Sequence, residues 1–120
     1  RLFGNGINFG TSNSFYISLH PSVGFHFRYG GTGDAGNAFT SSNITQSFVA
    51  NSWHHLAATW SNNAGTTTLK LFVDGIEVSS ATSTANLLFG STSFIGGGGD
   101  PANQFFGAGK MDEIRVWNQI

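Results

Sequence analysis

The feature that most constrains this sequence is a set of three strand-like stretches in its second half, separated by loops rich in Gly, Ser and Asn. They comprise residues 53–60, 67–73 and 110–118. Apolar side chains recur there at every second position, which is the period of a half-buried β-strand. No window keeps the i, i+3, i+4, i+7 spacing of an amphipathic helix for more than a turn. The chain is therefore predicted to be all-β.

The same alternation predicts about eight short strands in all, joined by glycine-rich turns, which is typical of an antiparallel β-sandwich or jelly roll. The predicted strands are residues 2–9 (one or two strands, interrupted at Gly4 and Gly6), 15–19, 23–29, 45–49, 53–60, 67–73, 76–79, 87–89, 93–96 and 110–118. Asp74-Gly75 predicts a two-residue hairpin, because a type I′ turn needs positive φ at both positions. A second turn is expected at residues 61–65. A bulge is expected near Asp112-Glu113, where the alternation slips by one residue.

Large side chains in these strands predict how the sandwich is filled. Trp53 and Trp60 are expected to bury their rings and to anchor a central strand. Leu69, Leu71 and Val73 alternate, so they should face one interior. The carboxylates of Asp112 and Glu113 are expected to accept backbone N–H bonds at the bulge.

Composition excludes several classes of function. At 120 residues the chain forms at most one domain, residues 1–120. Only 9% of its residues are charged, the net charge is −1 and the five basic residues are scattered, so no nucleic-acid footprint exists. The absence of cysteine excludes disulfides and thiolate metal sites. No run approaches the roughly 18 apolar residues of a membrane span.

The order of the motifs resembles a laminin-G-like, concanavalin A-type jelly-roll domain, with pentraxins as looser relatives. The resemblance is carried by Trp53–Ala57, Leu69–Gly75, Ile95–Gly96 and Gly109–Asn118. It covers residues 53–118 well, and the first 50 residues only loosely. It implies the fold and says little about the ligand.

Two departures from the family pattern are visible. The aromatic residue expected at Gly107 is found one position early, at Phe106. Complete domains of this kind usually run to roughly 150–200 residues, within the range of single β-sandwich domains. The opening strands are therefore expected to lie elsewhere in a longer protein, to have been trimmed, or to be supplied by another chain. The start at Arg1 also favours a piece of a larger protein.

The loop at residues 96–106 is the first candidate site. It combines Asp100, Asn103 and Gln104 with flexible carbonyl groups, and Ca²⁺ takes six to eight oxygen ligands of these kinds. The resemblance implies that the matching loop often lies near a calcium site. Asp34 is expected to help from a second loop, with Asn37 and Asn5 as further candidates. The alternative is a plain solvated loop.

The same loop is a candidate for ligand binding. Sugar recognition needs an aromatic platform and planar polar partners. Tyr29 and Phe105 are predicted to provide the platform, with Phe39 and Phe106 as alternatives. Asp100, Asn103 and Gln104 would bind the hydroxyl groups. For any single aromatic residue, core packing is the alternative.

Catalytic patterns are weak. Glycosidases on related jelly rolls carry Glu-x-Asp-x-x-Glu on one strand, which this chain lacks. Asp74 and Glu77 flank a turn, whereas Asp112 and Glu113 are neighbours that point to opposite faces. The four histidines form no His-x-His pair. Gly31–Gly36 matches a nucleotide-binding Gly pattern, but no helix is predicted after it.

The sequence therefore favours a non-catalytic recognition or adhesion module of an extracellular or cell-surface protein. Its partner would be a glycan or a protein surface, bound through the loops, with calcium as a candidate cofactor. The alternative is a structural building block of a filament, fibre or surface layer, assembled through open sheet edges. A glycan-cleaving enzyme is the third hypothesis, and the missing pair of acids argues against it.

Overall fold

All regular structure in the described part of the chain is β-strand. The computed structural model describes residues 2–5, 14–20, 24–30, 38–40, 51–84, 93–96 and 109–117. The strands are β1 (Phe3–Asn5), β2 (Ser14–His20), β3 (Gly24–Gly30), β4 (Ala38–Thr40), β5 (Leu56–Asn63), β6 (Thr66–Val73), β7 (Ile76–Ser83) and β8 (Ser93–Ile95). The predicted all-β class is confirmed.

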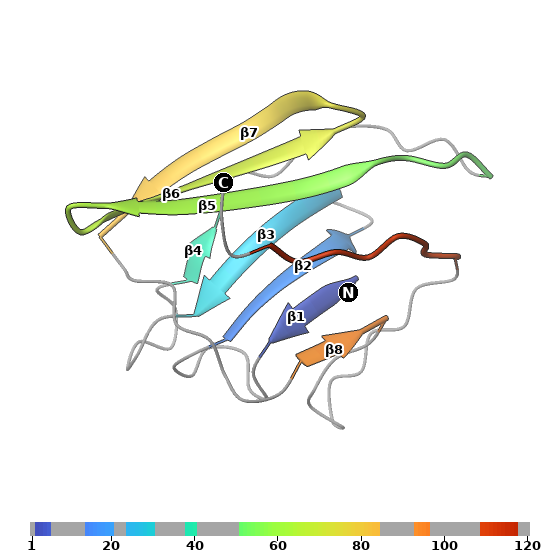
Figure 1. Ribbon diagram of the computed structural model, residues 1–120, viewed down its shortest axis with the longest axis horizontal. Coiled ribbons are helices and arrows are strands. Elements are labelled where there is room, and N and C mark those ends of the chain that lie inside the picture. The colour runs from blue at the N-terminus through green and yellow to red at the C-terminus, as the bar shows by residue number, and fades with distance from the viewer. Residues whose placement is uncertain are drawn as a thin grey trace.

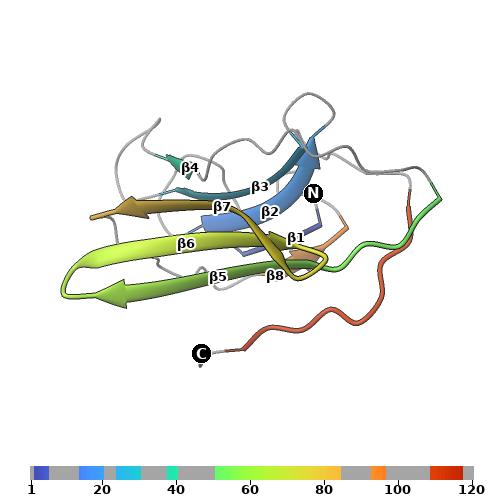
Figure 2. The ribbon, with the colours of Figure 1, turned by 90° about the horizontal axis from the view of Figure 1, so that it is seen from above.

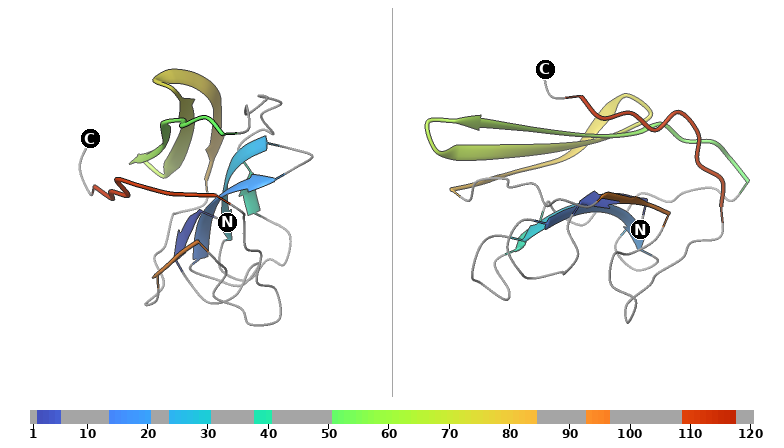
Figure 3. Two further views of the ribbon diagram at one scale, coloured as in Figure 1. Left: turned by 90° about the vertical axis from the view of Figure 1, so that its right-hand side faces the viewer. Right: turned by 60° about the horizontal axis from the view of Figure 1, so that its bottom comes forward.

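The strands form two antiparallel sheets that face each other (Figures 1 and 3). One sheet has five strands in the order β4-β3-β2-β1-β8, and the other has three in the order β5-β6-β7. Every described strand pairing is antiparallel. The predicted sandwich is therefore confirmed.

The core lies between the two sheets and is largely aromatic on one side. Phe15, Phe25 and Phe27 of the larger sheet are at most 2% exposed. On the smaller sheet β6 alternates buried and half-buried residues, and its buried side chains Leu69, Leu71 and Val73 are at most 1% exposed. The predicted shared interior of these three is confirmed. Burial of each such side chain stabilises the fold by about 1.5–3 kcal/mol.

Trp60 of β5 closes the core from the smaller sheet. Its ring centroid lies 6.1 Å from that of Phe15 and 6.4 Å from that of Phe27, the latter in an edge-on arrangement. Aromatic pairs at such separations add to the stabilisation from burial alone. Trp60 itself is half-buried, so its prediction as a core anchor is confirmed only in part.

Two tight turns connect the strands of the smaller sheet. Asp74 and Gly75 have φ of 53° and 81°, as the predicted type I′ turn requires. Ala64 and Gly65 form the second turn, with φ of 49° and 84°. The prediction of a turn over residues 61–65 was too wide, because β5 continues through Asn63. The Asn62 Nδ2 group donates to Thr67 Oγ1 at 2.9 Å. This side-chain hydrogen bond supports the pairing of β5 with β6 beyond their apolar residues.

Trp53 differs most from its prediction. Its side chain is 68% exposed, and the strand begins at Leu56 rather than at Trp53. The prediction that β5 is a central strand was also wrong among the described strands, where β5 is last in the order β5-β6-β7. Residues 53–55 precede β5, so Trp53 lies outside the described sheet.

The predicted last strand, residues 110–118, was wrong for the residues described, 110–117, which form no strand. The backbone departs from an extended course at Glu113, where φ is 53°. Because no described strand pairs with these residues, the predicted bulge is absent from them. Asp112 Oδ1 does accept the Glu113 N–H at 2.8 Å, as expected, whereas Glu113 forms an ion pair with Arg115.

The remaining strand predictions differ mainly in length. The strand predicted at residues 76–79 extends to Ser83, and a register shift between Leu71 and Phe72 gives one strand an extra residue. The strand β4 was not predicted, because three residues are too few to show a period. Predictions for residues 6–9, 23, 45–49 and 87–89 lie outside the described residues.

Candidate functional site

Most residues predicted to bind a ligand lie outside the described part of the chain. These are Asp34, Asp100, Asn103, Gln104 and Phe105. Tyr29 belongs to β3, where its backbone is opposite Phe15 of β2 and Phe39 of β4. The described residues contain no group of three or more His, Cys, Asp or Glu side chains that could hold a metal. The calcium site therefore stays a prediction.

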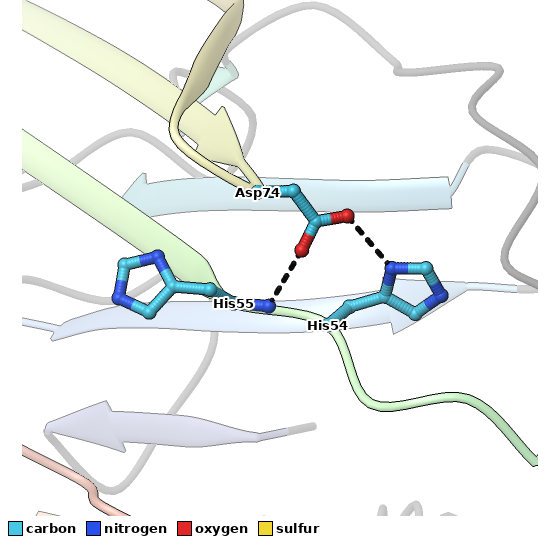
Figure 4. Close-up of polar contacts among 3 residues, drawn as sticks. All are labelled: His54, His55 and Asp74. Carbon is cyan, nitrogen blue, oxygen red and sulfur yellow. Dashed lines mark hydrogen bonds and ion pairs between the residues drawn. The ribbon is translucent and has the colours of Figure 1, made fainter.

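A polar cluster does form at one end of the smaller sheet, where the β6–β7 turn meets the residues preceding β5 (Figure 4). The Asp74 carboxylate binds both histidines. Its Oδ2 lies 2.9 Å from His54 Nδ1, and its Oδ1 accepts the His55 backbone N–H at 2.9 Å. The Asp74 N–H in turn donates to the His55 carbonyl at 2.8 Å. These contacts continue the β5–β6 ladder beyond its last paired strand residues.

The electrostatics of the cluster favour a charged Asp74. The hydrogen bond from His54 and then that from the His55 backbone hold the pKa of Asp74 below its ordinary value of 3.8. The Asp74 side chain is 48% exposed and that of His54 is 23% exposed. The exposed Asp74 carboxylate is therefore kept ionised and held in one orientation by the two residues that precede β5.

Two large apolar side chains are close in sequence to the residues of this cluster. Trp53 precedes His54 and Ile76 follows the turn, and each is 68% exposed. His55 is exposed as well. We define Trp53, His55, Asp74 and Ile76 as the turn site. It combines a flat aromatic ring, an apolar contact and hydrogen-bonding groups, which are the features that orient a ligand on a protein surface.

The described carboxylates already have partners. Asp74 binds the histidine pair, Glu77 binds Lys70 Nζ at 2.8 Å and Glu113 binds Arg115. Asp112 accepts the backbone N–H of its neighbour. These contacts account for each described acid without invoking acid–base chemistry. His54 and Asp74 do form a base–orienter pair, but the mostly buried ring favours a structural role.

Sequence reasoning missed the contact between Asp74 and the histidines, although the signal was present. The turn at Ala64-Gly65 joins β5 to β6 and fixes their register, with Leu56 opposite Val73. Counting one residue further places His55 beside Asp74. Turn chemistry alone is enough to explain an aspartate at this position, so the sequence gives no separate reason to look for a partner of its side chain.

Comparison with known proteins agrees with the fold. The family model described as the concanavalin A-like lectin/glucanases superfamily matches residues 3–120. No curated protein and no solved structure matches the chain. The match includes the first 50 residues, where the motifs gave only a loose resemblance, and the resemblance predicted from the sequence is confirmed. The chain therefore belongs to the concanavalin A-like lectin/glucanases superfamily, as a laminin-G-like domain.

Proposed function

We propose that the protein is a non-catalytic recognition module that binds a glycan, or a protein surface, outside the cell. The lectin-like fold supports this proposal, and laminin-G-like domains are commonly extracellular. The described residues include no helix with the length and hydropathy of a membrane span. Two tight β-hairpins hold the described loops at the ends of the smaller sheet, and loops on a rigid scaffold are where binding residues usually lie.

The observation that carries the proposal is the turn site. A Trp ring that is 68% exposed lies next in sequence to a histidine held by a carboxylate. A pyranose has an apolar face suited to stacking on such a ring, and its hydroxyl groups suit Asp74 and His55 as partners. Because both Asp74 oxygens are already oriented by the chain, little further ordering is needed on binding.

The loop at residues 96–106 is proposed as a second part of the binding surface. Asp100, Asn103, Gln104 and Phe105 would bind the ligand there, with Tyr29 as a further aromatic contact. Calcium, if it takes part, would be held by Asp100, Asn103 and Asp34. This part of the proposal rests on residue types and on the family resemblance.

A glycan array tests the proposal, screened once with calcium and once with EDTA. We expect a selective signal with the intact chain. Loss of the signal in EDTA would support calcium at Asp100, whereas a signal in both conditions would support recognition without metal. Absence of any selective signal in both conditions would contradict glycan recognition.

Variants then separate the two sites. Trp53→Ala should weaken binding by about tenfold or more, because truncating an aromatic hot-spot residue costs upwards of about 1–2 kcal/mol. Trp117→Ala is the matched control, since Trp117 is 69% exposed but lies outside the turn site. Combined replacement of Asp100, Asn103 and Phe105 by Ala tests the loop. Equal affinities for Trp53→Ala and the intact chain would exclude the turn site.

Structural assembly is a second candidate function. It is favoured by the open outer edges of the described sheets, where β5 and β8 are each last in their order. Exposed strand edges pair readily with other chains unless they are protected.

A further inference from the structure

The largest run of exposed apolar side chains in the described structure lies in residues 110–117, here called the exposed segment. Met111 and Ile114 are each 43% exposed, Val116 is 57% exposed and Trp117 is 69% exposed. Soluble proteins seldom leave so many large apolar groups together in water, and such surfaces usually mark interaction sites. We therefore expect the exposed segment to bind a partner.

The exposed segment also lies at an open side of the described sheets. In Figures 1 and 2 it runs past β5 on the side away from β6, at the open side of the smaller sheet. It takes part in no described strand pairing. Its described polar contacts are local: the Asp112 carboxylate accepts the Glu113 N–H, and Glu113 pairs with Arg115. Met111 also approaches the residue after β8, since its Cε would lie 3.3 Å from a Cβ atom placed on Gly96.

Glu113 interrupts the extended course of this segment. Its φ of 53° lies in the left-handed region, which is unfavourable for a residue with a side chain. Straightening Glu113 into an extended conformation would relieve this strain. It would also place Met111, Glu113, Arg115 and Trp117 on one face, and Asp112, Ile114 and Val116 on the other. The segment is therefore strained as it stands and better suited to a strand.

Symmetry and charge together identify a second copy of the chain as a partner that fits. Two copies of one strand that pair antiparallel about a two-fold axis must be centred on a residue facing its own copy, because opposed side chains share a face. Centring on Asp112, Glu113 or Arg115 places like charges directly opposite each other, which is destabilising. Centring on Ile114 avoids this conflict.

The register centred on Ile114 is complementary on the face that carries Glu113 and Arg115, whereas Asp112 faces Val116 on the other face. Glu113 of each copy faces Arg115 of the other, and Met111 faces Trp117. The two ion pairs that Glu113 and Arg115 form within the two copies are thereby exchanged for two ion pairs between them. Ile114 packs against Ile114 on the other face. We propose that two copies of the chain associate by antiparallel pairing of the exposed segments in this register.

This inference is independent of ligand recognition and is tested by sedimentation equilibrium of the intact chain over a wide concentration range. We expect a reversible dimer, of modest affinity because a two-stranded ribbon is only marginally stable. Glu113→Arg should weaken dimerisation by about tenfold or more, because it sets Arg opposite Arg twice. Arg115→Glu should weaken it similarly by setting Glu opposite Glu.

Mixing the two variants is the decisive experiment. A chain with Arg at both positions and a chain with Glu at both positions are complementary in the proposed register, so the mixture should dimerise although neither variant does alone. The double variant Glu113→Arg/Arg115→Glu should also dimerise. Because these side chains are 71% and 61% exposed, we expect both single variants to fold, which circular dichroism would check.

Leu19→Lys is the matched control, since Leu19 is 40% exposed, close to the 43% of Ile114, and lies outside both the exposed segment and the turn site. It should leave dimerisation unchanged. A monomer at all concentrations would overturn the inference. A dimer that tolerates both charge reversals would also overturn it, and would point instead to pairing through the edge of β5. Failure of the mixed variants to dimerise would exclude the register.

Discussion

The strand β6 and the exposed segment (residues 110–117) have similar sequence patterns and opposite environments. In β6, Leu69, Leu71 and Val73 are at most 1% exposed, and the strand pairs with neighbours on both sides. In the exposed segment the large apolar side chains are 43–69% exposed, and no described strand pairs with it. Alternation therefore shows that a stretch can form a strand, whereas its partners determine whether it does.

The largest expected effect comes from truncating one apolar residue in each region. Leu69→Ala should lower the free energy of unfolding by about 2–5 kcal/mol, because it leaves a cavity in the close-packed core. Ile114→Ala should change it by no more than about 0.5 kcal/mol, since the side chain is already 43% exposed. Urea unfolding, followed by tryptophan fluorescence at a protein concentration low enough for a monomer, measures both.

Of these two measurements, the change in the free energy of unfolding for Ile114→Ala is the more informative. A loss approaching that of Leu69→Ala would mean that the exposed segment is packed in solution. The contrast between the two regions would then fail. Ala58→Gly, in the outer strand β5, would calibrate the effect of a small change at a half-buried strand position.

Much of the smaller sheet was predictable because its signals are local. Asp74-Gly75 sets a two-residue turn, and the alternation on both sides of it then assigns Leu69, Leu71 and Val73 to one face. Here turn chemistry and apolar period agree, so the turn and the buried face follow from sequence, whereas the register shift between Leu71 and Phe72 does not. The contact of Asp74 with His55 was also within reach by counting residues along the hairpin.

The errors share one physical cause, which is that burial depends on strands distant in sequence. Trp53 was predicted to be buried because large aromatic residues usually are. However, β5 is an outer strand of the described sheet and begins only after Trp53. Residues 110–117 carry strand-forming side chains, but no local signal indicates whether an edge will be available. The candidate ligand residues, such as Asp100, are not among these errors and stay predictions, because residue type and family resemblance do not place side chains near one another.

The next prediction compares a glycine in the turn at residues 74–75 with a glycine next to the exposed segment. Gly75 has φ of 81°, and a Cβ atom at this position would meet open space, so Gly75→Ala is strained by the backbone alone. We expect a loss of about 1–2 kcal/mol in the free energy of unfolding, the usual penalty for a left-handed residue with a Cβ atom. Gly109→Ala is the control, because its Cβ atom would also meet open space and its φ is not positive. Equal losses would contradict the argument from φ.

The Asp74 cluster should make stability depend on pH in a known direction. Because its hydrogen bonds hold the pKa of Asp74 below 3.8, the folded state favours the ionised carboxylate. This contribution is fully present above the pKa of the unfolded chain and is lost as the pH falls through the lower pKa of the folded chain. Since Asp74 is well exposed, the effect should be smaller than that of Gly75→Ala.

Asp74→Asn isolates this charge, since asparagine tolerates the same left-handed backbone. The variant should be less stable than the intact chain near neutral pH. The difference should shrink as the solution is acidified through the pKa of Asp74. Thermal unfolding over a series of pH values would measure it, and a constant difference would show that ionisation of Asp74 does not contribute. Glu113→Gln, which removes a carboxylate of the exposed segment, is the matched control and should change stability little near neutral pH.

The smallest expected effect compares one ion pair in each region. Lys70 and Glu77 link paired strands β6 and β7, whereas Glu113 and Arg115 lie two residues apart in the exposed segment. Double-mutant cycles to Ala should give a coupling energy of about 0.2–1 kcal/mol for the first pair, which is typical of exposed ion pairs. In the monomer the second should be close to zero, because no strand pairing holds its side chains in place. Raising the salt concentration should reduce the first value. A larger coupling energy for Glu113 and Arg115 would show that the exposed segment is ordered by more than its local contacts.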